Sequence, residues 1–200
     1  YINYRGQLID SSLRLEKRKS QQIPLMQPTP AQAAELLELI LASKDSLLPF
    51  TAYTHGEFQA GDHHRLICDK LEAVEAGECK RLIITAPPRH TKSELGSRRF
   101  PAWYMGRNPT KQIICSTYGD DLAGDFGRDV RSIVSSDRYQ RVFPNTRLSA
   151  DSRAAGRWQT NHGGRYVSTG VGGPITGRGA DIALLDDYLK NRQEADSDAT

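Results

Sequence analysis

The sequence has few cysteines and no long hydrophobic run, and each absence excludes a class of protein. Its 200 residues include three cysteines, Cys68, Cys79 and Cys115, an odd number without CxxC spacing. A disulfide framework is therefore not expected, and a reducing compartment is the simpler interpretation. No apolar run approaches the roughly 18 residues that span a bilayer, so we expect no transmembrane helix. No basic-then-apolar leader opens the chain, which gives no support for secretion.

The composition is that of a folded domain. Hydrophobic residues make up 38% of the chain and charged residues 26%, which is enough apolar surface for a core and argues against wholesale disorder. The length suits one domain or slightly more. A net charge of +3 is only a mild preference for anionic partners.

Charge of one sign is scarce in two parts of the chain. Residues 80–112 include eight basic residues and a single acid, Glu94. Residues 181–200 include six acids and two basic residues. The two segments could meet around a phosphate and a metal ion. On charge alone, two separate solvated faces are the simpler interpretation.

Residues 1–28 are polar and irregular, with a basic group between Arg14 and Lys19. We interpret them as an arm or linker, whose basic group is by default solvated but could contact DNA or a partner. Residues 29–200 form the predicted domain. Thr29 and Gln32 fit a capping box at a helix start.

Short apolar strands alternate with helices over the rest of the chain, which predicts an α/β domain with a mostly parallel sheet flanked by helices. The first helix is expected to end before Pro49, and residues 50–61 to form a loop. The predicted strands are 82–85, 112–117, 166–169 and 182–185. The further predicted helices are 62–76, 93–105 with a bend at Pro101, and 122–135. Residues 136–165 are expected to be irregular but could include short strands, and the glycine-rich residues 170–180 are expected to form a long loop.

A candidate phosphate-binding loop lies at residues 86–93, with the sequence APPRHTKS, between a predicted strand and a predicted helix. In that context main-chain N–H groups and the helix N-terminus face an anion. Lys92 would reach the β- and γ-phosphates of ATP, and Ser93 would place its hydroxyl on Mg²⁺. The alternative is a strand-to-helix turn with a solvent-exposed lysine, because Ala86 and Thr91 occupy both glycine positions of GxxxxGK[ST]. A left-handed backbone at Thr91 would cost on the order of 1–2 kcal/mol.

A pair of acids follows the last predicted strand. Ile182-Ala183-Leu184-Leu185 runs directly into Asp186 and Asp187, and ligands of open α/β sheets bind at the carboxyl ends of strands. Asp186 would hold Mg²⁺, and Asp187 would orient the attacking water. Alone, these acids would be an ordinary acidic turn. About 94 residues after the candidate loop, the combination predicts a P-loop NTPase.

The combined motifs resemble one family, the large subunit of tailed-phage terminases. The resemblance rests on PPRHxKSE from Pro87, on SRRFPAWY from Ser97, on TGRGAD from Thr176 and on the Asp186-Asp187 pair. It covers about two thirds of the chain, from Phe58 to Asn191.

The resemblance implies an ASCE-type P-loop ATPase that pumps viral DNA into a procapsid. It implies functional roles for Arg89, Lys92, Ser93, Asp186 and Asp187. The expected cofactors are ATP and Mg²⁺. The expected partners are double-stranded viral DNA, the small terminase subunit and the portal of the procapsid, with a homo-oligomeric ring and no membrane, in the cytoplasm of a bacterial host. We also expect His90, Thr91 and Glu94 to lie in the ATP site.

The sequence departs from the family at three places. Thr91 stands where glycine is usual, and Asp187 is one methylene shorter than the usual glutamate. The chain ends at Thr200, so a coupling strand and the C-terminal nuclease domain are expected to be missing, the ATPase domain to be partial, and nuclease activity to be absent.

Several further residues have two interpretations each. Arg178 could sense the γ-phosphate or contact DNA, or be a surface arginine of a flexible loop. Gln59 could read the adenine edge while Phe58 stacks, or Phe58 could belong to the core. His63, His64 and Cys68 have a possible metal-ligand spacing, but lack a fourth ligand, so capping and packing are favoured. Trp103 and Tyr104 could stack on DNA, but packing against the sheet is favoured.

Two other functions compete with the terminase motor. One is a different nucleic-acid-stimulated P-loop ATPase, such as a helicase-like translocase. The other is an inactive truncated remnant that at most binds DNA or a partner.

Overall fold

The computed structural model describes residues 29–152, 154–173, 175, 177 and 179–188. The predicted arm, residues 1–28, lies outside them. The chain divides into two compact units, residues 1–34 and residues 35–200. In the first, Thr29 N donates to Gln32 Oε1 at 3.0 Å and Gln32 N donates to Thr29 Oγ1 at 3.3 Å, which confirms the capping box at the start of α2.

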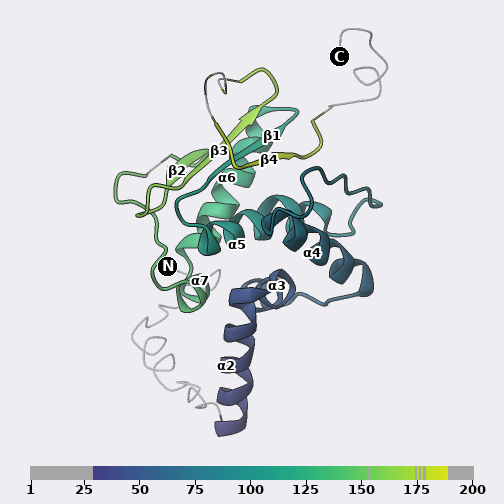
Figure 1. The fold of residues 1–200 in the computed structure, drawn as a ribbon, viewed down its shortest axis with the longest axis vertical. Helices are drawn as coiled ribbons and strands as arrows, with labels where there is room; N and C mark the ends of the chain where they lie inside the picture. Colours follow the sequence, from purple (N-terminus) through teal and green to yellow (C-terminus); the bar gives the residue numbers. More distant parts are fainter. Residues whose placement is uncertain (1–28, 153, 174, 176, 178, 189–200) are drawn as a thin grey trace, which may run out of the picture. The chain divides into compact units, whose positions relative to one another are not determined.

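Helices make up most of the N-terminal half and also follow the first strand (Figure 1). The predicted helices at 62–76 and 122–135 are confirmed, with each end within two residues of the prediction. Gly61 and Gly119 are their N-caps. The helices are α2 (Pro30–Asp45), α3 (Leu47–His55), α4 (Asp62–Glu75), the π-helix η1 (Glu94–Arg99), α5 (Phe100–Arg107), α6 (Asp120–Ser135) and α7 (Asp137–Val142).

The chain is helical where a loop was predicted after Pro49. Pro49 is the third residue of α3, a position whose N–H group has no intrahelical acceptor, so proline is tolerated there. Phe50 and Tyr53, inside the predicted loop, are buried on this helix. The prediction of a loop over 50–61 was therefore wrong for its first half.

Four strands form one mixed sheet in the order β2-β3-β1-β4. The strands are β1 (Gln112–Thr117), β2 (Arg157–Gln159), β3 (Arg165–Gly170) and β4 (Ile182–Leu185). β3 and β4 pair with β1 in parallel, and β2 pairs with β3 antiparallel. The predicted α/β fold is confirmed, and β1, β3 and β4 end at the same edge of the sheet. No helix of the described residues is long and apolar enough to cross a membrane.

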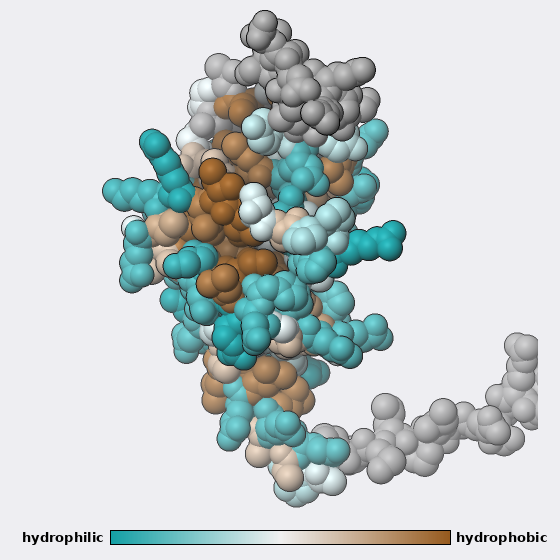
Figure 2. Space-filling model, turned by 90° about the vertical axis from the view of Figure 1, so that its right-hand side faces the viewer, coloured by the Kyte–Doolittle hydropathy of each residue, from teal (hydrophilic) through white to brown (hydrophobic). Residues whose placement is uncertain are grey.

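Residues 82–85 do not join the sheet, contrary to the prediction of a buried strand. Ile83 is 89% exposed, and β4 is the outermost strand of its side. A groove of about 780 Å³ lies between residues 80–84 and β4. Its lining includes Phe100 and Leu184, and Figure 2 shows apolar residues exposed in the middle of this side of the molecule. Within the described residues, β4 therefore has a neighbouring strand, β1, along one edge only, and Leu185 is 69% exposed.

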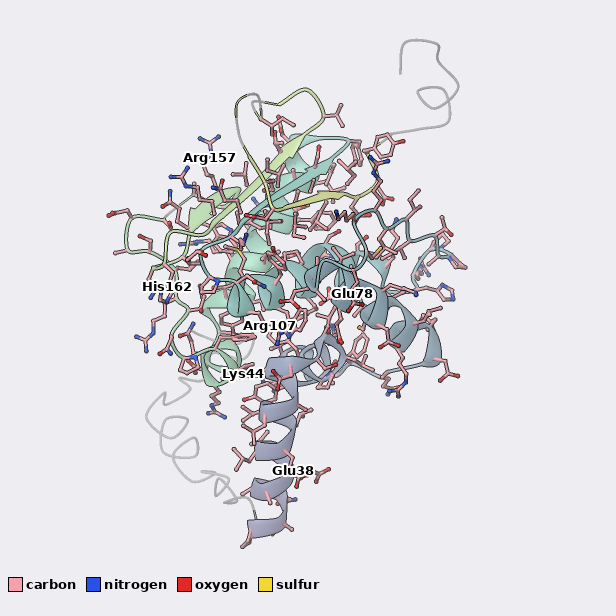
Figure 3. The ribbon with its side chains drawn as sticks, viewed as in Figure 1. Glu38, Lys44, Glu78, Arg107, Arg157 and His162 are labelled. Carbon is pink, nitrogen blue, oxygen red and sulfur yellow. The ribbon has the colours of Figure 1, made fainter. Side chains whose placement is uncertain are left out.

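α6 packs against the sheet through β1 and β3 (Figure 1), and the core continues from there among α3, α4, η1 and α5. Phe126 and Val130 of α6 are buried as the 3.6-residue period predicts. Trp103 is fully buried, and its Nε1 donates to the carbonyl of Ser43 at 3.2 Å. Figure 3 labels Arg107 of α5 and Lys44 of α2, where Arg107 Nη1 donates to the Lys44 carbonyl at 3.1 Å.

Candidate functional site

The loop at residues 86–93 turns sharply through left-handed backbone. Arg89 has a φ of 65° and Thr91 a φ of 57°. Thr91 therefore has the left-handed backbone that is costly for a β-branched residue. Among the described residues, the hydrogen bonds include none donated by the main-chain N–H groups of residues 89–93. Successive free N–H groups in alternating backbone conformations form a concave anion site.

Lys92 joins the loop to the two acids after β4. Its Nζ lies 3.3 Å from Asp186 Oδ1 and 3.0 Å from Asp187 Oδ1. The hydrogen bond to Asp187 is the largest influence on the pKa of Lys92 and raises it, against the opposing effect of burial, and Asp186 raises it further. The ammonium group is therefore held charged at the place where a phosphate would be expected.

The two acids have different surroundings. Asp186 is buried, whereas the side chain of Asp187 is 62% exposed. Both are anchored through the main chain to the end of β1, since Asp186 N donates to the Ser116 carbonyl at 3.0 Å and Tyr118 N donates to the Asp187 carbonyl at 3.1 Å. Asp187 has a φ of 45°, in the left-handed region. The chain thus turns directly after the strand, where both carboxylates contact Lys92.

Burial raises the pKa of Asp186, but hydrogen bonds from Ser97 and Ser93 and the charge of Lys92 outweigh it, so the pKa lies below its usual value. A buried carboxylate that stays ionised needs such partners. Ser93, which the sequence predicts as a metal ligand, is thus a hydrogen-bond partner of this carboxylate.

Ser97 is a residue of this site that the sequence analysis missed. Its Oγ donates to Asp186 Oδ2 at 2.6 Å, and both side chains are buried. Ser97 lies on the π-helix η1, and its partner Asp186 is 89 positions away in the sequence, so no local pattern predicts the contact. The one available signal was a small hydroxyl residue four positions after Ser93.

The basic and acidic segments meet, so the interpretation as two separate solvated faces was wrong. Besides Lys92 with the aspartate pair, Lys111 Nζ lies 2.8 Å from Asp181 Oδ1, at the other end of β4. The basic side chains of η1 are also paired, since Arg98 contacts Asp129 and Arg99 contacts Glu94, each at 2.6 Å. Much of the basic run therefore stabilises the fold.

Among the described residues, the others predicted for the ATP site take no part in the ion pairs of Lys92. Arg89 and His90 are exposed on the loop, where His90 Nδ1 lies 3.0 Å from the Pro88 carbonyl. The Glu94 carboxylate is occupied by arginines of η1. Gln59 is exposed, and no hydrogen bond within the described residues joins it to the loop. Arg178 lies outside the described residues.

The histidines near the loop pack against one another. The His63 ring centroid lies 3.7 Å from that of His64 and 5.7 Å from that of His90. His64 Nδ1 accepts a hydrogen bond from Gly61 N at 2.8 Å, and Cys68 is fully buried. The described residues include no cluster of three or more ligands for a metal ion. Capping and packing, the favoured alternative, therefore account for these residues.

Packing in the core accounts for the aromatic residues Phe58, Trp103 and Tyr104. Trp103 and Tyr104 are buried, so neither ring is available to stack on DNA. Phe58 packs on the core from its edge, and its ring centroid lies 4.8 Å from that of His64.

The site suits a magnesium-bound triphosphate better than a metal ion alone. Mg²⁺ in nucleotide sites is held by one or two carboxylates or hydroxyls together with phosphate oxygens and water. Asp186 and Ser93 supply hard oxygen donors, and the free N–H groups of residues 89–93 supply the complementary anion site. These residues fit the group that the sequence predicts.

Replacing Thr91 with glycine is expected to stabilise the chain. A left-handed β-branched residue costs about 1–2 kcal/mol, and the greater freedom of glycine in the unfolded chain offsets about 0.5–1 kcal/mol of that. The expected gain in the free energy of unfolding is up to about 1 kcal/mol, measured by urea denaturation. Thr110→Gly is the control, since Thr110 is exposed and lacks a positive φ. Equal destabilisation by both changes would contradict the strain at Thr91.

Comparison with known families places this geometry in context. The sequence profile of the family described as "Terminase large subunit, T4likevirus-type, N-terminal" matches residues 83–200, more than half of the chain. The chain belongs to this family. Neither the comparison with curated proteins nor the comparison with solved structures found a match.

The matched range of this terminase region begins in the extended segment before the candidate phosphate-binding loop and includes η1, the sheet and Asp186. The resemblance drawn from the motifs is thereby confirmed for the N-terminal part of the terminase large subunit. Membership gives the chain a role in viral DNA packaging and favours the terminase interpretation over a helicase-like translocase.

Proposed function

We propose that this chain is the ATPase motor part of a terminase large subunit, in which ATP hydrolysis drives the packaging of viral DNA. The observation that carries the proposal is the contact of Lys92 with Asp186 at 3.3 Å across 94 positions of sequence, in a chain of the terminase family. A lysine after a phosphate-binding turn and a carboxylate at a strand end are the two parts that hold ATP and its metal in P-loop enzymes.

Each residue of the site has a role in this proposal. Lys92 would contact the β- and γ-phosphates in place of Asp187, and main-chain N–H groups of residues 89–93 would bind the remaining phosphate oxygens. Ser93 and Asp186 would hold Mg²⁺, which would supply positive charge beside the phosphates. Asp187, which is exposed, would orient the attacking water.

Arg89, exposed in the middle of the loop, would contact phosphate in the same proposal. His90, Thr91 and Glu94 surround the nucleotide, with Glu94 acting through the helix that it stabilises. Gln59 beside Phe58 is the candidate for the adenine edge, and Arg178 is a candidate for the γ-phosphate.

The finer fold that we propose for residues 29–200 is an ASCE-type P-loop NTPase. The parallel pairing of β1 with β3 and β4, and the position of Asp186 at the carboxyl end of β4, support it. Residues 80–84 and β4 lie on opposite sides of the groove. This arrangement fits a sheet in which one more strand would occupy the groove between them.

The proposed partners follow from a packaging motor. They are double-stranded viral DNA, the small terminase subunit, the portal of the procapsid and further copies of the chain in a ring, in the cytoplasm of a bacterial host. Contacts to DNA phosphates would make binding strongly salt-dependent. Lys80 and Arg81, in the basic run but outside the ion pairs of the described residues, are candidates for such contacts.

Measurement of ATP binding and turnover by the 200-residue chain tests the proposal. We expect a fluorescent ATP analogue to bind in Mg²⁺ and to be released by EDTA, and we expect phosphate release that rises with duplex DNA. Robust turnover would exclude the inactive remnant. The absence of binding in Mg²⁺, with the chain folded by circular dichroism, would overturn the proposed ATP site.

A further inference from the structure

A buried hydroxyl of the helix after the phosphate-binding loop contacts the acid at the end of β4. Ser97 Oγ and Asp186 Oδ2 are 2.6 Å apart although the residues are separated by 89 positions in the sequence. Ser97 is 4% exposed and Asp186 6%. An O–H···O⁻ bond of this length between buried groups is charge-assisted and among the stronger hydrogen bonds of a protein.

The two oxygens of Asp186 have different partners. Oδ2 accepts the hydrogen bond from Ser97, whereas Oδ1 lies 3.3 Å from Lys92 Nζ. Ser97 thereby fixes the rotation of the carboxylate about its terminal bond, which is otherwise soft. Oδ1 is left directed toward the loop that carries Lys92 and Ser93.

Ser97 lies on the helix that begins at the phosphate-binding loop. It is four positions after Ser93, a spacing that brings two side chains to the same face of a helix, and both serines hydrogen-bond Asp186. The helix has a π turn here, since Phe100 N donates to the Leu95 carbonyl, five residues earlier, instead of the usual four. π turns are rare and are frequently found at functional sites.

We propose that Ser97 is a positioning residue that orients Asp186 for the metal ion. The inference rests on the proposed function, because it assigns to Asp186 the role of a magnesium ligand. Residues that hydrogen-bond a metal ligand fix its orientation, and their loss typically lowers metal affinity or activity about 10- to 100-fold. Ser97 acts through Asp186 and does not contact the nucleotide.

The test compares ATP affinity with and without metal in Ser97→Ala. We expect the affinity in Mg²⁺ to fall about 10- to 100-fold, the affinity in EDTA to stay within about twofold, and Mn²⁺ binding in the presence of ATP, followed by electron paramagnetic resonance, to weaken in parallel. Ser97→Thr retains the hydroxyl and should restore most of the affinity in Mg²⁺. Ser43→Ala is the control, since Ser43 is fully buried and its hydroxyl bonds only the Leu39 carbonyl.

Each outcome decides the matter. Equal loss of affinity in Mg²⁺ and EDTA, or no loss in either, would overturn the positioning role while leaving the ATP site intact. If the original chain binds no ATP at all, the proposed function fails first and this inference falls with it. Should Ser97→Ala fail to fold, Ser97→Thr and Ser97→Val, which differ chiefly in the hydroxyl, provide the same comparison, and equal Mg²⁺ affinity in those two would contradict the proposal.

Discussion

Replacing Lys92 with alanine is expected to abolish ATP binding in Mg²⁺, with a loss of affinity of about 100-fold or more. Hydrogen bonds to charged groups contribute about 1.5–3 kcal/mol each, and Lys92 is positioned to make two with the triphosphate. Its removal also leaves Asp186 and Asp187 without the cation that now lies within 3.3 Å of both. Two unpaired carboxylates would repel the incoming phosphates.

The measurement is a titration with a fluorescent ATP analogue at constant Mg²⁺. Lys111→Ala is the matched control, because Lys111 also pairs with an acid beside β4, Asp181. It removes the same charge and a comparable ion pair from the opposite end of the strand. An unchanged affinity in Lys92→Ala, or equal losses in both variants, would remove the phosphate-loop assignment.

Asp186→Asn is expected to remove the metal-dependent part of ATP affinity. The amide keeps the size of the side chain and can still accept the hydrogen bond from Ser97, so the fold should be retained. The loss of the charge next to a metal should cost about 2–5 kcal/mol, which corresponds to at least about 30-fold in the affinity for ATP in Mg²⁺. Affinity in EDTA should stay the same or improve, because a negative charge beside the phosphates has gone.

Asp181→Asn is the control for this variant. Asp181 directly precedes β4 whereas Asp186 directly follows it, and Asp181 pairs with Lys111 at 2.8 Å. Binding is compared in Mg²⁺ and in EDTA for both variants, and thermal unfolding checks that each is folded. If Asp186→Asn keeps its response to Mg²⁺, the carboxylate at the end of β4 is not the metal ligand.

Much of the site was predictable because its parts are local in sequence. A strand that runs into two acids and a turn that opens a helix with Lys92 are each recognisable over a few residues. The rule that parallel strands end at one edge of a sheet then brings them together. β1 and β4, and the helices α4 and α6, were predicted in place for the same reason.

The errors have physical causes that a local pattern does not contain. Residues 82–84 are apolar and residues 83–85 are β-branched, but a strand needs a partner, and β4 does not pair with this segment. Pro49 is a helix breaker in a helix interior but is tolerated in a first turn, so α3 was missed. The π-helix depends on hydrogen bonds at a spacing of five residues, and only its tertiary contact reveals the role of Ser97.

The outer edge of β4 has a consequence for handling this chain in solution. Within the described residues no strand pairs with this edge, and Leu185 and Ile83 are exposed beside it. An unpaired strand edge can pair with other extended chains and promotes aggregation. We therefore expect the protein to associate increasingly as it is concentrated, and a charged substitution such as Leu185→Lys to reduce that association, because charged side chains on an edge strand oppose edge-to-edge pairing.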